Sequence, residues 1–300
     1  MGKCIAVTGA SGTLGLEIIS RLSKRVDILV AFTSSEKRVC DAADDASQIV
    51  AVPRDAFDVF EQYHIDCVVN CAFPRSDAGD DLAKGMRYSA DLFEAIEKNK
   101  VGALINVSSQ SVYSQSRIGS TDESEPICPE GRYAMGKYSV ELLADHIVRN
   151  VPLAHVRLAS LIGVGYDERF ISYFIRKILS NERFTAIQGS SRYGFMDVRD
   201  AATAITIMSL SSPSEWRRLY NLGPACGGYS MDEIVDAIRA VSRKHGYNPK
   251  CNLTRNDALH GSGLSSKRFE SDFGWHSRFT LVETIDWIMR HYLHARNCSD

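Results

Sequence analysis

Residues 5–15 read IAVTGASGTLG, an apolar run followed by three glycines at intervals of three residues. The apolar run predicts a buried strand, and the apolar spacing of LGLEIISRLSKR behind it predicts an amphipathic helix. A strand, a glycine-rich turn and a helix in this order form the phosphate-binding corner of a dinucleotide site. We therefore expect Gly9 to permit the tight turn, Gly12 to let the backbone approach a pyrophosphate, and Gly15 to let helix and strand pack closely.

The alternation of strand-like and helix-like segments continues through the first half of the chain. Six short apolar runs are typical of buried strands: KCIAVTG, VDILVAF, QIVAV, DCVVNCA, ALINVSS and LAHVRLA. Amphipathic segments such as DAFDVFEQYHI and SADLFEAIEKNK lie between them. This order predicts an α/β fold, a Rossmann-type doubly wound parallel sheet built from right-handed βαβ units.

The pattern changes after about residue 165. FISYFIRKILSNE, YSMDEIVDAIRAVSRKHG and LVETIDWIMRHYLHA are predicted helices, and FMDVRDAATAITIMSL is a predicted short strand followed by a helix. Ser230 and Glu233 are spaced as a capping box at the start of the second of these helices.

Two domains are predicted from this change of pattern. Residues 1–165 form the dinucleotide-binding domain, and residues 195–222 return to it. Residues 166–194 and 223–300 form a smaller C-terminal α/β lobe that binds substrate. A cleft between the two would lie over the carboxyl ends of the parallel strands, where open α/β sheets bind ligands.

The composition excludes several classes of protein. The 300 residues are 44% hydrophobic and 24% charged with a net charge of −2, so no basic surplus predicts nucleic-acid binding. No apolar stretch reaches the roughly 18 residues of a membrane span, and the N-terminus lacks the pattern of a signal peptide. We expect a soluble, cytoplasmic protein without a membrane partner.

The eight cysteines are scattered along the chain, which does not predict a disulfide framework. Cys67 and Cys71 are four residues apart, but they lie in a predicted buried strand with no second pair nearby. We therefore expect no metal site.

Eight motifs along the chain carry a family resemblance: TGASGTLG, VVNCAF, NVSSQSVYS, YAMGK, VRLASLIGVG, SRYGFMDVRDAA, YNLG and LSSKRFESDFGW. In this order they resemble the extended short-chain dehydrogenase/reductase family, in its nucleotide-sugar-modifying branch of NAD-dependent epimerases and dehydratases. The resemblance runs from residue 5 to about residue 290 and implies an enzyme with a nicotinamide cofactor. In the family, pairs of helices often form a homodimer, and here these helices would be SADLFEAIEKNK and the one carrying YAMGKYSVELLADHIV.

The candidate catalytic residues are Ser109, Tyr133 and Lys137. Tyr133 and Lys137 are four residues apart, so on a helix they share one face. A free tyrosine has a pKa of about 10, and a nearby ammonium group favours the phenolate that could act as a base. The resemblance implies that Ser109 holds the substrate oxygen, whereas Ser108 is expected to face the sheet or the cofactor and Ser111 to contact substrate.

The residues after Ser109 bear on the reaction type. Family dehydratases carry an Asp-Glu pair where Gln110 and Ser111 stand, and members that epimerise and reduce GDP-sugars carry a cysteine at the position of Ser111. The resemblance therefore implies hydride transfer at C4 of a nucleotide-linked sugar, by a 4-ketoreductase or a 4-epimerase. The alternatives are a reductase of a non-nucleotide carbonyl substrate and a catalytically silent NAD(P)-binding sensor.

The glycine turn and the resemblance together assign a set of residues to the cofactor. These are Gly9, Ser11, Gly12, Thr13, Leu14, Gly15, Thr33, Ser34, Lys37, Arg38, Cys71, Ala72, Tyr133, Lys137 and Ser160. No carboxylate stands near Thr33, where NAD sites usually carry one to bind the ribose diol. Because Ser34, Lys37 and Arg38 could bind a 2′-phosphate, we expect NADP rather than NAD, although Glu36 opposes this, and NADP favours a reductase.

The expected substrate contacts are Ser111, Phe170, Arg192, Tyr193 and Arg255. A nucleotide sugar needs cations on its pyrophosphate, and Arg255, twelve residues before Lys267, fits one arginine of the family pattern. Tyr193 stands at the usual place of the other arginine, with Arg192 one residue earlier, so the pattern departs from the family there.

Overall fold

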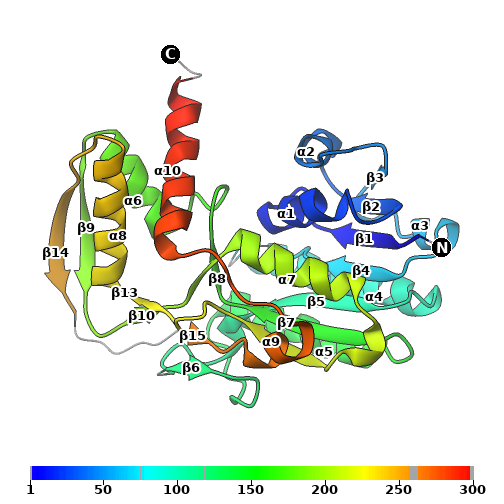
Figure 1. Cartoon of the computed structure of the whole chain (residues 1–300). Helices are drawn as coiled ribbons and strands as arrows, with labels where there is room; N and C mark the ends of the chain where they lie inside the picture. The colour runs from blue at the N-terminus through cyan, green and yellow to red at the C-terminus, as the bar shows by residue number, and fades with distance from the viewer. Residues whose placement is uncertain (1, 75, 77, 118, 257–262, 298–300) are drawn as a thin grey trace.

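A seven-stranded parallel sheet forms the centre of the larger part of the molecule (Figure 1). The computed structural model describes residues 2–74, 76, 78–117, 119–256 and 263–297. The strands lie in the order β12-β7-β5-β4-β1-β2-β3. Their bounds are β1 (Cys4–Thr8), β2 (Ile28–Phe32), β3 (Ile49–Val52), β4 (Cys67–Asn70), β5 (Leu104–Ser109), β7 (Leu153–Leu158) and β12 (Leu219–Leu222). The predicted fold class is confirmed, and all six predicted strands are present.

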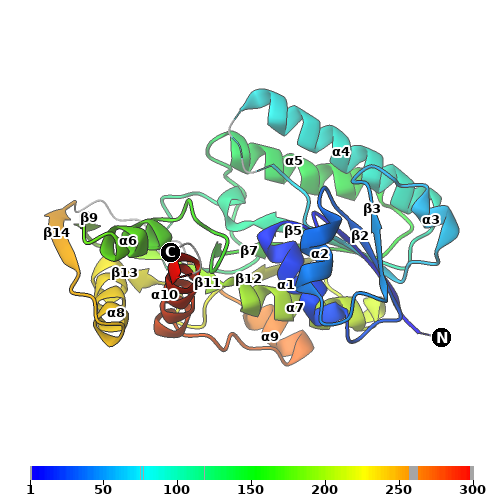
Figure 2. The ribbon, with the colours of Figure 1, turned by 90° about the horizontal axis from the view of Figure 1, so that it is seen from above.

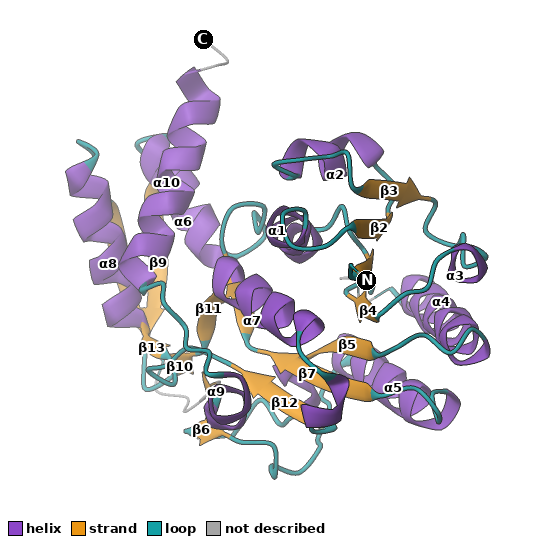
Figure 3. Ribbon diagram, turned by 45° about the vertical axis from the view of Figure 1, so that its right-hand side comes forward, coloured by secondary structure: helices purple, strands orange, loops and turns teal. Residues whose placement is uncertain are grey.

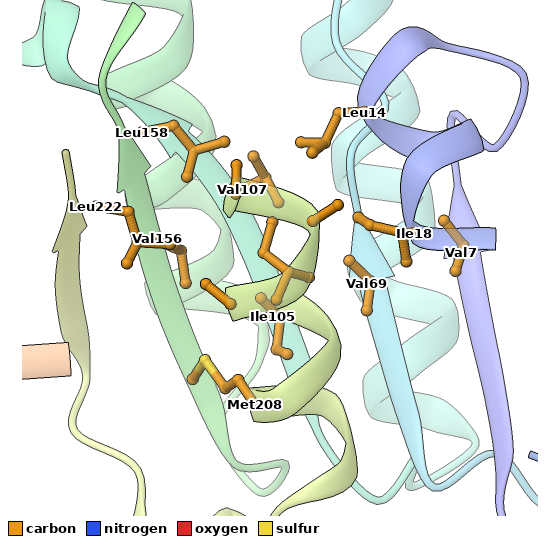
Figure 4. Packing of buried hydrophobic residues seen from close by; sticks show 14 of the residues in the cluster. Val7, Leu14, Ile18, Val69, Ile105, Val107, Val156, Leu158, Met208 and Leu222 are labelled. Carbon is orange, nitrogen blue, oxygen red and sulfur yellow. The ribbon is translucent and has the colours of Figure 1, made fainter. Parts of the chain in front are cut away.

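Helices cover both faces of this sheet (Figure 3). One face carries α1 (Thr13–Leu22), α2 (Glu36–Ala42) and α7 (Val198–Leu210), and the other carries α3 (Val59–Gln62), α4 (Gly79–Lys98) and α5 (Arg132–Ile147). The alternation of side chains along β1 separates the two cores, because Ile5 and Val7 pack with Ile18 of α1 while Ala6 packs with Phe93 of α4. Figure 4 shows part of the first core, in which side chains of the strands, among them Val7 and Ile105, pack with Ile18 of α1 and Met208 of α7.

The strand order reverses between β1 and β4, which puts a crevice at the carboxyl ends of these two strands. Ligands of open α/β sheets bind at such a switch point. The turn after β1 and the residues after β4 therefore lie where a cofactor is expected.

A second hydrophobic core lies in the lobe drawn at the left of Figure 1. It is formed by α6 (Phe170–Leu179), α8 (Met231–Lys244), α10 (Leu281–Asn297) and the parallel pair β9 (Arg183–Gln188) and β14 (Lys250–Arg255). Ile175, Phe184, Ile238 and Ile285 are among its fully buried members. The predicted capping box of α8 is confirmed, since its serine and glutamate bond each other's backbone N–H groups.

Several further short elements complete the described fold. They are β6 (Ser120–Thr121), β8 (Ser160–Ile162), β10 (Arg192–Tyr193), β11 (Phe195–Asp197), β13 (Tyr229–Ser230), β15 (Gly263–Leu264), α9 (Lys267–Phe273) and the 3-10 turns Gln110–Val112 and Pro213–Glu215. We propose that residues 1–165 and 195–222 form one domain, because α7 and β12 pack in the sheet core. The α9 segment lies in the range predicted for the lobe, but Phe269 packs against Tyr220 of β12, so we assign it to the sheet domain.

Side chains at the start of α7 hold the lobe against the sheet domain. The Asp200 carboxylate accepts the backbone N–H groups of Arg278 and Phe279, each at 3.0 Å. The Arg199 guanidinium lies 3.6 Å from the ring centroid of Phe279 and 4.1 Å from that of Trp287 in α10. These contacts link the start of α7 to the segment that leads into α10 and to α10 itself.

Among the described helices, we find none long and apolar enough to cross a bilayer. Helices α4 and α5 lie side by side on one face of the sheet, as the view in Figure 2 shows.

Candidate active site

The glycine turn after β1 has the geometry that a bound pyrophosphate requires. Gly9 adopts a φ of +64°, in the left-handed region, and its carbonyl accepts the N–H of Gly12 at 2.9 Å. A Cβ on Gly15 would lie 2.3 Å from the Gly9 carbonyl oxygen, so any side chain there would push α1 away from the turn. The N-terminus of α1 begins at Thr13, and the residues fit a phosphate group at that end of the helix.

A cavity of about 770 Å³ adjoins this turn, and we call it the glycine-turn cavity. Its lining includes Gly9, Ser11, Gly12, Thr33, Ser34, Arg54, Asp55, Cys71, Ala72, Phe73, Lys84 and Tyr88. Seven of the predicted cofactor residues are thus brought together. Lys37 and Arg38 are exposed on α2 and do not line it.

A second cavity of about 460 Å³ lies beside the first and shares Cys71 and Phe73 with it. We call it the Tyr133 cavity. Its lining includes Leu14, Ser76, Val107, Ser108, Ser109, Gln110, Ser111, Gln115, Tyr133, Lys137, Ser160, Tyr166, Glu168 and Arg169. The three predicted catalytic residues therefore lie in one cavity, next to the cavity at the glycine turn.

Helix α5 positions Tyr133 and Lys137. The Lys137 side chain is buried, and its Nζ donates a hydrogen bond of 2.7 Å to the carbonyl of Val107 in β5. It also lies 4.8 Å from the centre of the Phe73 ring, and the Tyr133 ring packs against that ring with centroids 6.0 Å apart. The Lys137 ammonium group and the Tyr133 phenol thus both contact the ring of Phe73.

The serines at the end of β5 form a short hydrogen-bonded group. Ser109 Oγ accepts the backbone N–H of Ser111 at 3.2 Å and the Ser111 hydroxyl at 3.0 Å. Because Ser109 Oγ is the acceptor in both hydrogen bonds, its own hydroxyl hydrogen can be donated to a group in the cavity. Ser108 is buried, and its Oγ makes no hydrogen bond with any described residue.

Gln110 occupies the wall of the Tyr133 cavity as a hydrogen-bonding group. Its Nε2 donates to Ser160 Oγ at 3.0 Å, and its Oε1 accepts from Arg117 at 3.2 Å. A neutral amide with both ends engaged supplies neither acid nor base to the cavity.

Cys71 lines both cavities, and its surroundings disfavour the thiolate form. Burial raises the pKa of its thiol to about 12, although the charge of Lys137 acts in the opposite direction. Across the described ranges we find no cluster of three His, Cys, Asp or Glu side chains able to hold a metal ion.

Four of the predicted substrate contacts do not line the Tyr133 cavity. Phe170 and Tyr193 pack against Phe195 in the lobe, at ring distances of 5.2 and 5.8 Å. The Arg192 guanidinium donates to the carbonyl of Gly228 at 2.6 Å, because β10 pairs with β13. Arg255 is exposed at the end of β14.

The two cavities are also lined by charged residues that were not predicted from the sequence. Glu168 and Arg169 line the Tyr133 cavity just before α6, and Arg54, Asp55 and Lys84 line the glycine-turn cavity. The position of Arg54, two residues after the third predicted strand, was the one available signal, since residues that follow a strand lie at the carboxyl edge of the sheet.

The fold and the glycine turn are those of a dinucleotide-binding α/β protein. A sequence model of the NAD dependent epimerase/dehydratase family matches residues 5–223. The chain therefore belongs to this family, whose members are enzymes.

Individual relatives are distant. The chain is 23% identical over 213 residues to a dTDP-glucose 4,6-dehydratase from Streptomyces niveus, an alignment that spans 65% of this chain and 60% of the relative. It resembles the solved UDP-glucose 4-epimerase of Thermotoga maritima with a TM-score of 0.80 and 17% identity, over 97% of this chain and 99% of the other. A UDP-glucuronic acid 4-epimerase from Bacillus cereus, solved with NAD, gives a TM-score of 0.79 and 17% identity over 96% and 99%.

Proposed function

We propose that the protein is an NAD(P)-dependent reductase or epimerase that moves hydride at C4 of a nucleotide-linked sugar. The observation that carries this proposal is that Ser109, Tyr133 and Lys137 line one cavity directly beside the cavity at the glycine turn. NADP is the cofactor that we favour, with NAD as the alternative, and the relatives solved with NAD and nucleotide sugars support the wider class.

When bound, NAD(P) supplies the nicotinamide carbon that takes or gives the hydride. The Ser109 hydroxyl donates a hydrogen bond to the substrate oxygen, and Tyr133 moves the proton at that same oxygen. The Lys137 ammonium, held by the Val107 carbonyl, stabilises the phenolate form of Tyr133 by its charge.

Elimination at C6 is not part of the proposal, even though a dehydratase is among the relatives. Removing a hydroxyl by 4,6-dehydration needs an acid and a base beside the reacting carbons. Gln110 is a neutral amide engaged at both ends, and Ser111 donates its hydroxyl to Ser109. We expect no 4-keto-6-deoxy product from dTDP-glucose.

The cofactor retained on purification tests the choice between reductase and epimerase. The purified protein is denatured, and any released nicotinamide nucleotide is identified and quantified. We expect an empty protein that then binds NADPH more tightly than NADH, because a reductase exchanges its cofactor in each turnover. NAD released in a nearly equimolar amount would instead identify an epimerase, which keeps its cofactor between two half-reactions, and would overturn the preference for NADP.

Arg169 is the cation that we propose for the substrate pyrophosphate. Its Nε is buried and makes no hydrogen bond within the part of the chain that the structure describes. It lines the Tyr133 cavity and precedes the N-terminus of α6, whose N–H groups also favour an anion.

Replacing Arg169 by alanine is expected to raise KM about 10- to 100-fold and to change kcat less, because the lost charge-assisted hydrogen bonds hold the substrate in ground and transition state alike. Steady-state kinetics with a nucleotide sugar measure both constants. Arg192→Ala is the matched control, since it removes the same charge outside the cavity. An unchanged KM for Arg169→Ala, or a larger change for Arg192→Ala, would contradict this assignment.

A non-nucleotide carbonyl substrate is the second candidate. It is favoured by one observation, namely that neither Arg192 nor Arg255 lines the Tyr133 cavity. A substrate without a pyrophosphate would be reduced as well by the Arg169→Ala variant as by the unchanged protein.

The homodimer stays a prediction, with one supporting feature on α5. Met135 and Leu142 lie seven residues apart on this helix and are 55% and 50% exposed. Large apolar side chains at such spacing share a helix face, as a helix–helix contact between two copies requires.

A further inference from the structure

Arg54 stands at the carboxyl edge of the sheet, next to the end of β2. Strands β2 and β3 are parallel, and their last paired residues are Phe32 and Val52. The pairing continues with a hydrogen bond of 2.9 Å from the N–H of Thr33 to the carbonyl of Val52. Ser34 and Arg54 each follow two residues after the last pair, so the register brings them to the same edge, and both line the glycine-turn cavity.

The end of β2 is where dinucleotide sites meet the adenosine ribose, and a carboxylate there binds the ribose diol of NAD. Residues 33–35 are Thr-Ser-Ser and offer only hydroxyl groups. The Thr33 hydroxyl accepts the N–H of Ser35 at 2.9 Å, and Ser34 Oγ lies 3.4 Å from Ser11 Oγ. No charge in this segment would repel a phosphate on the ribose.

The Arg54 guanidinium is exposed, and no hydrogen bond or ion pair joins it to any described residue. Asp55 and Asp81 also line the cavity, but neither lies within ion-pair distance of Arg54. A guanidinium presents a planar fork of donors that matches two phosphate oxygens. Lys37 and Arg38, the cations that the sequence favoured, do not line the cavity.

We propose that Arg54 binds the 2′-phosphate of NADP(H) and thereby determines the preference for this cofactor over NAD(H). The proposal rests on the proposed function, because it requires the glycine-turn cavity to hold the adenosine end of a dinucleotide. It assigns cofactor choice to the end of β3, whereas the sequence analysis placed it after β2.

The test compares two probes that differ only in the 2′-phosphate, adenosine 2′,5′-bisphosphate and adenosine 5′-monophosphate. Calorimetric titration gives the Kd of each probe for the unchanged protein, Arg54→Ala and Arg38→Ala. We expect Arg54→Ala to weaken the bisphosphate about 10- to 100-fold, as loss of a charge-assisted hydrogen bond predicts, and the monophosphate by less than about twofold. Arg38→Ala, which removes a neighbouring exposed charge, should leave both probes unchanged.

Several results would overturn the role of Arg54. They are an equal loss for both probes, a selective loss in Arg38→Ala, or an unchanged protein that binds the bisphosphate no better than the monophosphate. In each of these cases the adenosine site survives, and with it the proposed hydride transfer with NAD as the alternative cofactor. If the unchanged protein binds neither probe and neither NADH nor NADPH, the cofactor site itself fails. Since Arg54 is exposed, thermal unfolding should show that the variant remains folded.

Discussion

Replacing Tyr133 by phenylalanine is expected to lower kcat about 10²- to 10⁴-fold, the range that a positioned acid–base group contributes. The change removes only the hydroxyl that moves the proton at the substrate oxygen. The ring can keep its edge contact with Phe73 at 6.0 Å, and the Lys137–Val107 hydrogen bond does not depend on it. Cofactor affinity should therefore change by less than about twofold. Steady-state kinetics and a fluorescence titration with NADPH measure the two quantities.

Tyr138→Phe is the matched control for this prediction. Tyr138 lies on the same helix and packs against the sheet core, and it does not line the Tyr133 cavity. The control should retain kcat within about twofold. Full activity of Tyr133→Phe would show that the proton moves through another group. A loss of cofactor affinity as large as the loss of kcat would show that Tyr133 acts in binding.

The elements that sequence alone predicted are those determined by local constraints. The strands and the glycine turn are determined by residues that are neighbours in the chain. In the turn, for example, the positive φ of Gly9 and the close approach of Gly15 to the Gly9 carbonyl both lie within one short segment. The proximity of Tyr133 and Lys137 could be predicted for the same reason, because residues four apart on a helix lie on the same face.

The misplaced residues depend on contacts between distant segments. On α2 the buried residue is Val39, and this sets which face of the helix meets the protein, so that Lys37 and Arg38 face solvent. The Arg192 side chain donates a hydrogen bond to the carbonyl of Gly228, which lies 36 residues further along the chain. The position of Arg169 in the Tyr133 cavity likewise depends on how α6 packs in the lobe, which no spacing in the sequence encodes.

A buried ion pair fixes the helix that carries Tyr133, and breaking it should be the most destabilising change. Arg157 in β7 donates two hydrogen bonds to the Glu141 carboxylate in α5, at 3.0 and 2.6 Å, and both residues are at most 5% exposed. The Arg157 guanidinium also donates to the Tyr113 hydroxyl at 2.9 Å. These bonds join α5 to the sheet beneath it.

Glu141→Ala is expected to lower the free energy of unfolding by about 3–5 kcal/mol, because it leaves the buried guanidinium without its counter-charge. Urea unfolding followed by circular dichroism measures this difference. Lys37→Ala, at an exposed position of α2 outside the proposed contact between copies, should cost less than about 1 kcal/mol. The double variant Glu141→Leu with Arg157→Met should recover much of the stability, since it buries no charge and fills a similar volume. If Glu141→Ala costs no more than Lys37→Ala, water must reach the guanidinium, and the pair does not hold α5 in place.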